Sequence, residues 1–247
     1  MTTLLERADS AVRWGRALSF LVPYSTTLTV LNRVMGADRI QPMNRLLCIG
    51  MLKTVGVKWR SEVHPAVRDD ESYVFAQNHI NHLDFITMHN ATPHFKQGVE
   101  LETHFRYPFY GWFMSSRGTI PVPADKTKRT DAVREGMREE IARHHSILAF
   151  PEGTRTLDGT VGPFRTGIFF IARDLGLKVV PTAVTGMFEV MRKGSYLLRG
   201  GDVCVYCDEP VDFAGRNDDE VREGAEAVRS AIVARVEAHR AKVEGTR

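Results

Sequence analysis

Short apolar runs alternate with longer segments whose apolar residues recur at helical spacing, and this pattern extends from about residue 56 to the end of the chain. Short runs bounded by polar residues are typical of buried strands. They lie at 55–63, 73–77, 99–105, 119–122, 146–150 and 178–184. Helical spacing with charged residues on the other face predicts helices. These segments lie at 130–144, 167–175 and 218–243.

The secondary structure of the remaining segments is predicted from their turn residues and from the prolines and glycines that end helices and strands. A helix is expected from about His82 to Ala91, because Pro93 ends it. Residues 107–117 predict an aromatic-rich helix or turn, and residues 195–211 predict two strands that turn at Gly200–Gly201. Strands and helices in alternation predict an α/β fold with a sheet flanked by helices.

Residues 4–58 differ from the rest because they contain two longer apolar stretches. One lies at 17–31 and includes Pro23, and the other lies at 46–52. Neither reaches the roughly 18–20 apolar residues that a membrane-spanning helix needs. No signal-peptide cleavage site follows them. We expect two helices joined near 36–42 that are apolar on one side and arginine-rich on the other, and that lie in a membrane interface without spanning it. The alternative is that these helices only pack on the core and the arginines are solvated.

Charge is unevenly distributed although the formal net charge is only +3. Basic residues before Ser61 outnumber the three acidic ones, Glu6, Asp9 and Asp38. They are Arg7, Arg13, Arg16, Arg33, Arg39, Arg45, Lys53, Lys58 and Arg60. Such a segment suits an anionic membrane surface. Nucleic acid is not expected as a partner, because no nucleic-acid-binding motif accompanies the charge.

The three cysteines do not form a disulfide or zinc pattern. Cys48 stands alone, and Cys204 and Cys207 lie in a strand-like segment without a second Cys or His pair at zinc spacing. Residues three apart on a strand face opposite sides. We expect no metal site, and free cysteines favour the reducing cytosol.

Candidate chemistry is concentrated directly after the strand at 73–77. His79 and Asp84 are five residues apart, so on one continuous helix they could not share a face. They can meet if His79 lies in a turn and Asp84 lies in the first turn of a helix capped by Asn81. A carboxylate on one imidazole nitrogen leaves the other nitrogen free to accept a proton. The alternative is that Asp84 only caps the helix and His79 is an ordinary loop residue.

A second polar turn follows the strand at 146–150. It contains Glu152, Gly153, Thr154 and Arg155 in the sequence Phe-Pro-Glu-Gly-Thr-Arg. Backbone N–H groups and a guanidinium in such a turn can bind phosphate. The alternative is a local ion pair between Glu152 and Arg155 that fixes the loop.

Together, these two motifs resemble those of the phospholipid/glycerol acyltransferase family, whose best-known type is 1-acylglycerol-3-phosphate acyltransferase. The resemblance extends to residues 117–122 and 179–182 and covers roughly residues 59–210. It implies a mixed central sheet with the site at one end of its strands. It also implies that His79 is the general base, that Asp84 orients it, and that residues Arg117, Gly118, Glu152, Gly153, Thr154 and Arg155 hold the acceptor phosphate.

The chain departs from the family pattern at several positions. The family commonly has an arginine where this chain has Pro123-Ala124, and Lys126, Lys128 or Arg129 can replace it. Asn81 stands where the family usually has serine, and His82 is outside the pattern. Auxiliary roles are expected for Asn78, His82, Lys126 and Lys128. The aromatic residues at 105–113 either line an acyl-chain groove or belong to the core.

Other reaction classes lack their motifs. The chain has no G-x-S-x-G nucleophile elbow, no P-loop and no Rossmann glycine fingerprint. We therefore expect an enzyme that moves an acyl group from acyl-CoA or acyl-carrier protein to a lysophospholipid, with lysophosphatidate as the first candidate and no cofactor. Alternatives are the same chemistry on another lysolipid or glycolipid, and a non-enzymatic membrane-binding protein. The expected organisation is a membrane-associating segment, 1–55, and a catalytic domain, 56–247, bound peripherally at the cytoplasmic face.

Overall fold

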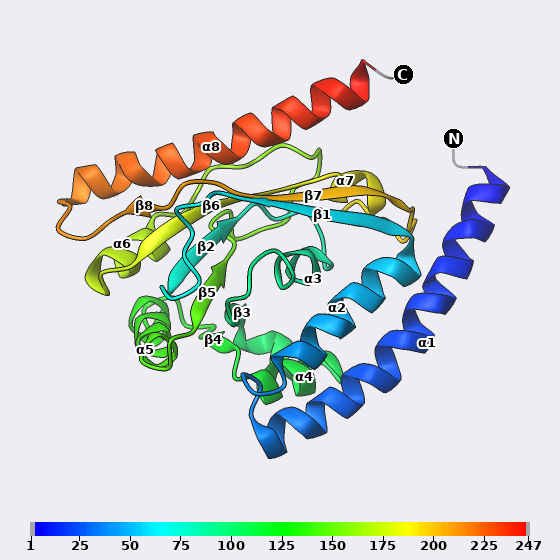
Figure 1. The fold of residues 1–247 in the computed structure, drawn as a ribbon, viewed down its shortest axis with the longest axis horizontal. Helices are drawn as coiled ribbons and strands as arrows, with labels where there is room; N and C mark the ends of the chain where they lie inside the picture. The colour runs from blue at the N-terminus through cyan, green and yellow to red at the C-terminus, as the bar shows by residue number, and fades with distance from the viewer. Residues whose placement is uncertain (1–2, 246–247) are drawn as a thin grey trace.

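One mixed sheet of eight strands forms the centre of residues 3–245, which the computed structural model describes (Figure 1). The strand order is β1–β7–β6–β2–β5–β3–β4, and β8 also pairs with β6. The strands are β1 (Val57–Val63), β2 (Tyr73–Gln77), β3 (Lys96–Leu101), β4 (Ile120–Val122), β5 (Ser146–Ala149), β6 (Lys178–Thr185), β7 (Gly201–Cys207) and β8 (Val211–Asp212).

Strand direction determines where the polar turns meet. Strands β6, β2, β5, β3 and β4 run parallel to their neighbours, whereas β7 and β8 run antiparallel to β6. In the β2–β5 pair, Ala76 lies opposite Ala149. The segments that leave these two strands, with His79 in one and Glu152 in the other, therefore emerge side by side at the same edge of the sheet.

Helices cover both faces of the sheet (Figure 1). Successive side chains of a strand point to opposite faces, and in β2 Tyr73 and Phe75 join one buried cluster while Val74 and Ala76 join the other. The first cluster includes residues of α1, α2, α3, α4 and α7, and the second includes residues of α5, α6 and α8. The helices after α2 are α3 (Asp84–Met88), the 3-10 helix η1 (Glu102–Arg106), α4 (Tyr110–Arg117), α5 (Arg129–Ile141), α6 (Gly167–Asp174), α7 (Met187–Val190) and α8 (Asp218–Glu244).

Two helices, α1 (Leu4–Met35) and α2 (Gln41–Val55), precede the sheet. Thr3 and Glu6 form a capping box at the start of α1, and the helix continues through Pro23. The guanidinium of Arg13 donates to the backbone oxygen of Val55 and so binds the end of α2. Within residues 3–245, no helix is both long and apolar enough to cross a bilayer.

Both helices expose apolar side chains that the core does not cover. These are Leu4, Leu5, Val12, Leu18, Val22, Val30, Val34, Met35, Met43, Leu46 and Ile49. The opposite sides of the helices contact the rest of the protein, because Leu28, Leu47, Cys48 and Met51 are buried in the first core cluster. Each helix therefore has an inner face that packs on the core and an outer face that is partly apolar.

Several expected elements differ from the structure. The helix expected from about His82 to Ala91 is only α3, since residues before Asp84 form a turn that binds its carboxylate. The segment 195–211 contains one complete strand, β7, and only the first residue of β8, not a hairpin at Gly200–Gly201. The strand expected at 99–105 begins earlier, at Lys96, and η1 follows it. Helix α7 was not predicted, because it has only four residues and no periodic pattern.

Candidate active site

His79 and Asp84 form the centre of the polar edge of the sheet. His79 Nδ1 lies 2.7 Å from Asp84 Oδ2, and the imidazole stacks on Phe150 with ring centroids 4.2 Å apart. A carboxylate only accepts hydrogen bonds, so the Nδ1 position carries the proton and Nε2 carries the lone pair. Within residues 3–245, no hydrogen bond or ion pair engages Nε2. The His79 side chain is 24% exposed, so the imidazole is partly accessible from solvent.

Asp84 is held in place by the turn that precedes it. Its Oδ2 atom also accepts hydrogen bonds from the backbone N–H of Ile80, at 2.6 Å, and of Asn81, at 3.0 Å. The carboxylate is only 1% exposed. Burial raises the pKa of Asp84, whereas the hydrogen bonds from His79, Ile80 and Asn81 oppose this shift. The turn therefore fixes the carboxylate and, through it, the orientation and tautomer of the imidazole.

Asn81 does not cap α3 as the sequence predicted. The residue at the N-cap position is Leu83, which has no side-chain cap, and Asn81 Oδ1 accepts from the Leu83 N–H at 2.8 Å. The contact expected between the Asp84 carboxylate and the Asn81 N–H is present. The Asn81 amide nitrogen donates instead to two carbonyl oxygens at the ends of α7, those of Met187 and Met191, at 3.1 and 2.9 Å. Asn81 thus joins the turn to α7.

Glu152 joins the two polar turns and does not pair with Arg155. Its Oε1 accepts from the His79 N–H at 2.7 Å, and its Oε2 accepts from the Gly162 N–H at 2.8 Å. Burial raises the pKa of Glu152, and the two backbone hydrogen bonds oppose this shift. The expected alternative, a Glu152–Arg155 ion pair, is absent from the described residues. Glu152 therefore positions the backbone of His79.

Gly153, Thr154 and Arg155 form an exposed turn beside His79. Gly153 has a φ of +65°, which glycine adopts without strain. Arg155 Nη1 donates to His82 Nε2 at 2.5 Å, and no carboxylate pairs with Arg155 among residues 3–245. The backbone N–H of Thr156 donates to the His79 carbonyl at 2.8 Å. An uncompensated guanidinium therefore lies in the turn that is bound to the His79 backbone.

His82 is outside the family pattern, yet it contacts the predicted phosphate-binding arginine. Partial burial lowers the pKa of His82, and the positive charge of Arg155 lowers it further. His79, Glu100 and His104 are the other charged or titratable groups that face it. A neutral His82 can accept the hydrogen bond from Arg155, whereas a protonated one cannot.

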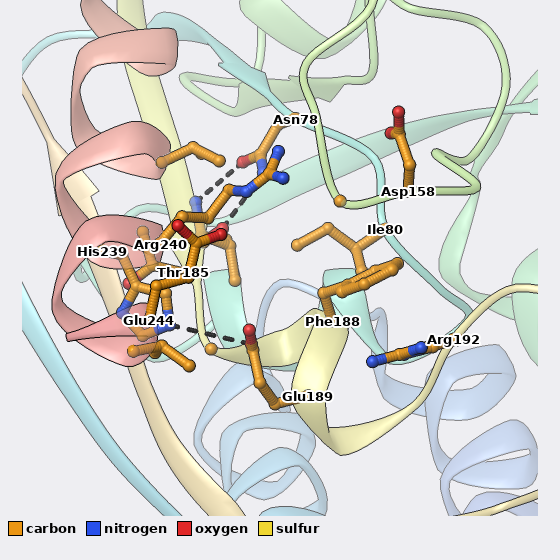
Figure 2. Close-up of a pocket in the computed structure, with 15 residues that line it drawn as sticks. Asn78, Ile80, Asp158, Thr185, Phe188, Glu189, Arg192, His239, Arg240 and Glu244 are labelled. Carbon is orange, nitrogen blue, oxygen red and sulfur yellow. Dashed lines mark hydrogen bonds and ion pairs between the residues drawn. The ribbon is translucent and has the colours of Figure 1, made fainter. Parts of the chain in front are cut away.

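Asn78 supports the site from behind. Its amide donates to the Val184 carbonyl at 3.0 Å and accepts from the Val184 N–H at 2.7 Å, which ties the turn to β6. A cavity of about 150 Å³ lies behind this contact, between the turn, α7 and α8 (Figure 2). Glu189 of α7 faces His239 of α8 across 3.7 Å in this cavity. Asn78 therefore holds the turn against β6.

The structure corrects the expected position of Arg117 and Gly118. Arg117 is buried, donates to the Lys96 carbonyl at 3.1 Å and lies over the Phe95 ring. It lines a second cavity of about 520 Å³ between the α1–α2 connection and the strand starts. Gly118 is the left-handed C-cap of α4. Both residues precede β4 and lie near the start of β3, so they are at the edge of the sheet opposite His79. Burial lowers the pKa of Arg117 to about 10.

Lys126 and Lys128 follow β4 and lie at the same edge of the sheet as His79. Strand β4 is the outermost strand, so β3 and β5 separate it from β2. Lys128 lies 3.9 Å from Asp125. Arg129 donates to the carbonyl oxygens of Pro123 and Ala124, so its guanidinium stabilises this loop. The structure does not bring these cations to the Arg155 turn.

The aromatic segment is divided between the core and the surface. Phe113 is buried, and Phe105 and Tyr110 pack against the same core cluster. Tyr107, Phe109 and Trp112 are exposed, and the rings of Phe109 and Trp112 lie 5.2 Å apart. The core interpretation is therefore wrong for these three residues.

Sequence reasoning missed two cations beside the turn. Lys193 donates to Thr154 Oγ1 and to the Arg155 carbonyl, and the guanidinium of Arg165 lies against Gly153. No motif marks Lys193, which lies in an irregular loop after α7. Within residues 3–245, no group of His, Cys, Asp and Glu side chains is suited to hold a metal ion, and all three cysteines are buried and free.

Comparisons with known proteins identify a matching family and similar sequences. A family model described as Acyltransferase matches residues 60–185. A chloroplastic 1-acyl-sn-glycerol-3-phosphate acyltransferase of Brassica napus is 35% identical over 144 residues, which cover 58% of this chain and 41% of that protein. The 1-acyl-sn-glycerol-3-phosphate acyltransferase of Escherichia coli is 31% identical over 170 residues, which cover 66% of this chain and 67% of that protein.

The same fold occurs in a solved structure. The 1-acyl-sn-glycerophosphate (LPA) acyltransferase PlsC of Thermotoga maritima superimposes with a TM-score of 0.76 at 19% identity, over 95% of this chain and 96% of that chain. At this identity the match shows the fold alone. The chain spans about two fifths of the length of the chloroplastic relatives that it matches, 41% in Brassica napus and 40% in Arabidopsis thaliana.

Proposed function

Because the chain belongs to the Acyltransferase family, whose model matches residues 60–185, we propose that it transfers a fatty acyl group from a thioester to the free hydroxyl of a lysophospholipid. One observation carries this proposal: His79, bonded to buried Asp84, lies beside a turn whose arginine has no carboxylate partner among the described residues. Such a site combines a general base with an anion-binding group. It suits a substrate that has both a hydroxyl and a phosphate.

The proposed chemistry needs no cofactor and no enzyme nucleophile. His79 Nε2 removes the proton of the acceptor hydroxyl while the oxygen attacks the thioester carbonyl. Asp84 stabilises the imidazolium that forms. The C–S bond then breaks, and the thiolate leaves with the proton from His79. The new C–O bond is the ester, and the released thiol is CoA or the carrier protein's phosphopantetheine.

Lysophosphatidate is the proposed acceptor. The proposal is supported by the names of the Brassica napus and Escherichia coli relatives, which are 1-acyl-sn-glycerol-3-phosphate acyltransferases. Arg155 can bind a phosphate with two parallel hydrogen bonds. Because this chain has Pro123-Ala124 where the family commonly has an arginine, the same chemistry on another lysolipid or glycolipid is the second candidate.

We further propose that α1 and α2 attach the enzyme peripherally to an anionic membrane at its cytoplasmic face. Support comes from their exposed apolar side chains, of which Leu4 and Leu5 are each 83% exposed and Val34 is 76% exposed. Basic residues such as Arg7, Arg16 and Arg33 are exposed on the same helices. Apolar insertion and charge attraction together favour binding in the interface.

Acyl-CoA consumption with a panel of acceptors tests the proposed function. Thiol release is measured with lysophosphatidate, other lysophospholipids, a glycolipid and no acceptor. The proposal expects acceptor-dependent release that is fastest with lysophosphatidate and yields phosphatidic acid. Faster release with another lipid would favour the second candidate. If neither acyl-CoA nor acyl-carrier protein gives acceptor-dependent thiol release, the proposed enzymatic function would be wrong. A non-enzymatic membrane-binding protein would then be favoured.

A further inference from the structure

Three cations surround the turn of Gly153, Thr154 and Arg155, and none has a carboxylate partner within residues 3–245. Arg155 itself contacts only His82 through its side chain. A Cβ built on Gly153 would lie 2.8 Å from Arg165 Cζ, so the guanidinium of Arg165 lies against this glycine. Lys193 approaches from another part of the chain. Other arginines of this protein pair with acids, for example Arg134 and Arg173, whereas the cations of this turn have no such partner within residues 3–245, so the turn has a local excess of positive charge.

Lys193 contacts the turn directly. Its Nζ donates to the Arg155 carbonyl at 3.0 Å and to Thr154 Oγ1 at 3.1 Å. An ammonium group has three donors, so one remains after these two contacts. The side chain is only partly exposed, which strengthens its interaction with an anion relative to a freely solvated lysine.

The neighbouring Arg192 provides a contrast. Its guanidinium lies over the Phe188 ring, 4.9 Å from the centroid. Figure 2 shows Arg192 and Phe188 at the cavity between α7 and α8. Lys193 does not line this cavity. Adjacent cations of one loop thus have different environments, and only Lys193 contacts the Arg155 turn.

Asn81 fixes the position of this loop. Its amide nitrogen donates to the carbonyl oxygens of Met187 and Met191, and its backbone N–H donates to Asp84. An asparagine amide has two N–H donors, whereas a serine hydroxyl has one. The residue that replaces the family's usual serine therefore connects the His79–Asp84 turn to the segment that ends at Lys193.

We propose that Lys193 is a second cation of the subsite formed by Arg155, and that this subsite binds a phosphomonoester dianion. The inference rests on the proposed function. A phosphomonoester has three terminal oxygens, so the planar guanidinium can bind two and the ammonium can bind the third. Two such groups occur in the reaction, the headgroup of lysophosphatidate and the 3′-phosphate of CoA. We assign the subsite to the acceptor headgroup, because the turn lies directly beside His79.

Isothermal titration calorimetry on the full chain tests this assignment without turnover. The Lys193→Gln variant retains N–H donors for Thr154 and Arg155 but loses the charge, Lys193→Arg restores the charge, and Arg192→Gln is the matched control. A short-chain lysophosphatidate is titrated in the absence of donor. We expect Lys193→Gln to raise its Kd about tenfold, which corresponds to about 1.4 kcal/mol. Lys193→Arg should recover most of the affinity, and Arg192→Gln should bind like the wild type.

Parallel titrations distinguish the source of the phosphate. Lysophosphatidylglycerol is a phosphodiester, so the change from wild type to Lys193→Gln should weaken its binding less than that of lysophosphatidate. CoA should bind Lys193→Gln and the wild type with equal affinity. If Lys193→Gln binds CoA more weakly than the wild type does but binds dephospho-CoA equally well, the subsite binds the 3′-phosphate of CoA. This result would overturn its assignment to the acceptor headgroup. The proposed subsite would be wrong if Lys193→Gln bound lysophosphatidate with the same Kd as the wild type. It would also be wrong if the wild type bound neither lysophosphatidate nor CoA.

Two further controls keep the outcomes separate. Thermal unfolding identifies a variant that does not fold, in which case Lys193→Met replaces Lys193→Gln in the same titrations. If the wild type binds lysophosphatidate through Lys193 but transfers no acyl group to any acceptor, the proposed function fails and the phosphate subsite stands. If the wild type transfers acyl groups but its lysophosphatidate Kd does not change in Lys193→Gln, the phosphate subsite fails and the proposed function stands.

Discussion

At the scale of single residues, the site separates a base from an anion-binding group and uses buried acids for positioning. Asp84 and Glu152 are both buried, and both accept backbone N–H groups of the turn that contains His79. Within residues 3–245, the cations Arg155 and Lys193 form hydrogen bonds only with neutral groups, which are His82, Thr154 and a carbonyl oxygen. Positive charge is thus left for a substrate, while negative charge is used to hold the base.

The contact between His82 and Arg155 predicts a pH dependence of acceptor binding. Because the pKa of His82 is lowered, the ring stays neutral and accepts from Arg155 down to a pH below the ordinary value of about 6.5. Below its own pKa it becomes charged, loses the hydrogen bond and repels the guanidinium. We therefore expect the acceptor KM of the wild type to rise on the acid side relative to that of His82→Gln, whose amide oxygen does not titrate.

The measurement is the ratio of the two acceptor KM values from pH 7 downward. Titration of the acceptor phosphate affects both proteins and cancels in this ratio. At neutral pH, His82→Gln should retain most of its turnover, because His82 does not contact His79 or Asp84. A ratio that is independent of pH would show that His82 does not position Arg155.

At the scale of elements, α1 and α2 have one face on the core and one face toward solvent. Not all of their basic residues are available to a membrane. Arg13 pairs with Asp9 at 2.7 Å and binds the end of α2, and Arg45 contacts Asn90. Arg7, Arg16 and Arg33 are exposed, and within residues 3–245 their side chains form no hydrogen bond or ion pair. These three are the cations that α1 can present to anionic lipid.

Changing Arg7, Arg16 and Arg33 to Gln should weaken binding to anionic liposomes and reduce its dependence on salt. Each cation near such a surface contributes about 1 kcal/mol, and salt screens this attraction. Cosedimentation over a range of salt concentrations measures the effect. The control is the change of Arg138, Arg143 and Arg222 to Gln, which removes the same charge from exposed positions on α5, α8 and the segment after α5. Equal loss of binding in both variants would mean that net charge, and not α1, determines attachment.

At the scale of the whole molecule, sheet topology explains which predictions from sequence succeeded. Local pattern was sufficient for a sheet flanked by helices, and the family resemblance added that the sheet is mixed. Local pattern was also sufficient for the contact between His79 and Asp84, because the two residues lie in one short turn. Arg117 was misplaced because motif order does not reveal strand direction, and residues before β4 lie at the edge opposite His79. Lys193 was missed because it reaches the site only through the fold of an irregular loop, which Asn81 attaches to the turn.

The central claim is that His79, oriented by Asp84, is the base that activates the acceptor. Its most direct test is the turnover number of His79→Ala and Asp84→Asn at saturating lysophosphatidate and acyl donor, with thermal unfolding to verify the fold. We expect His79→Ala to lose turnover by about 10²–10⁴-fold, Asp84→Asn to be severely impaired, and the acceptor Kd of both to stay near that of the wild type. A folded His79→Ala protein with wild-type turnover would contradict the account.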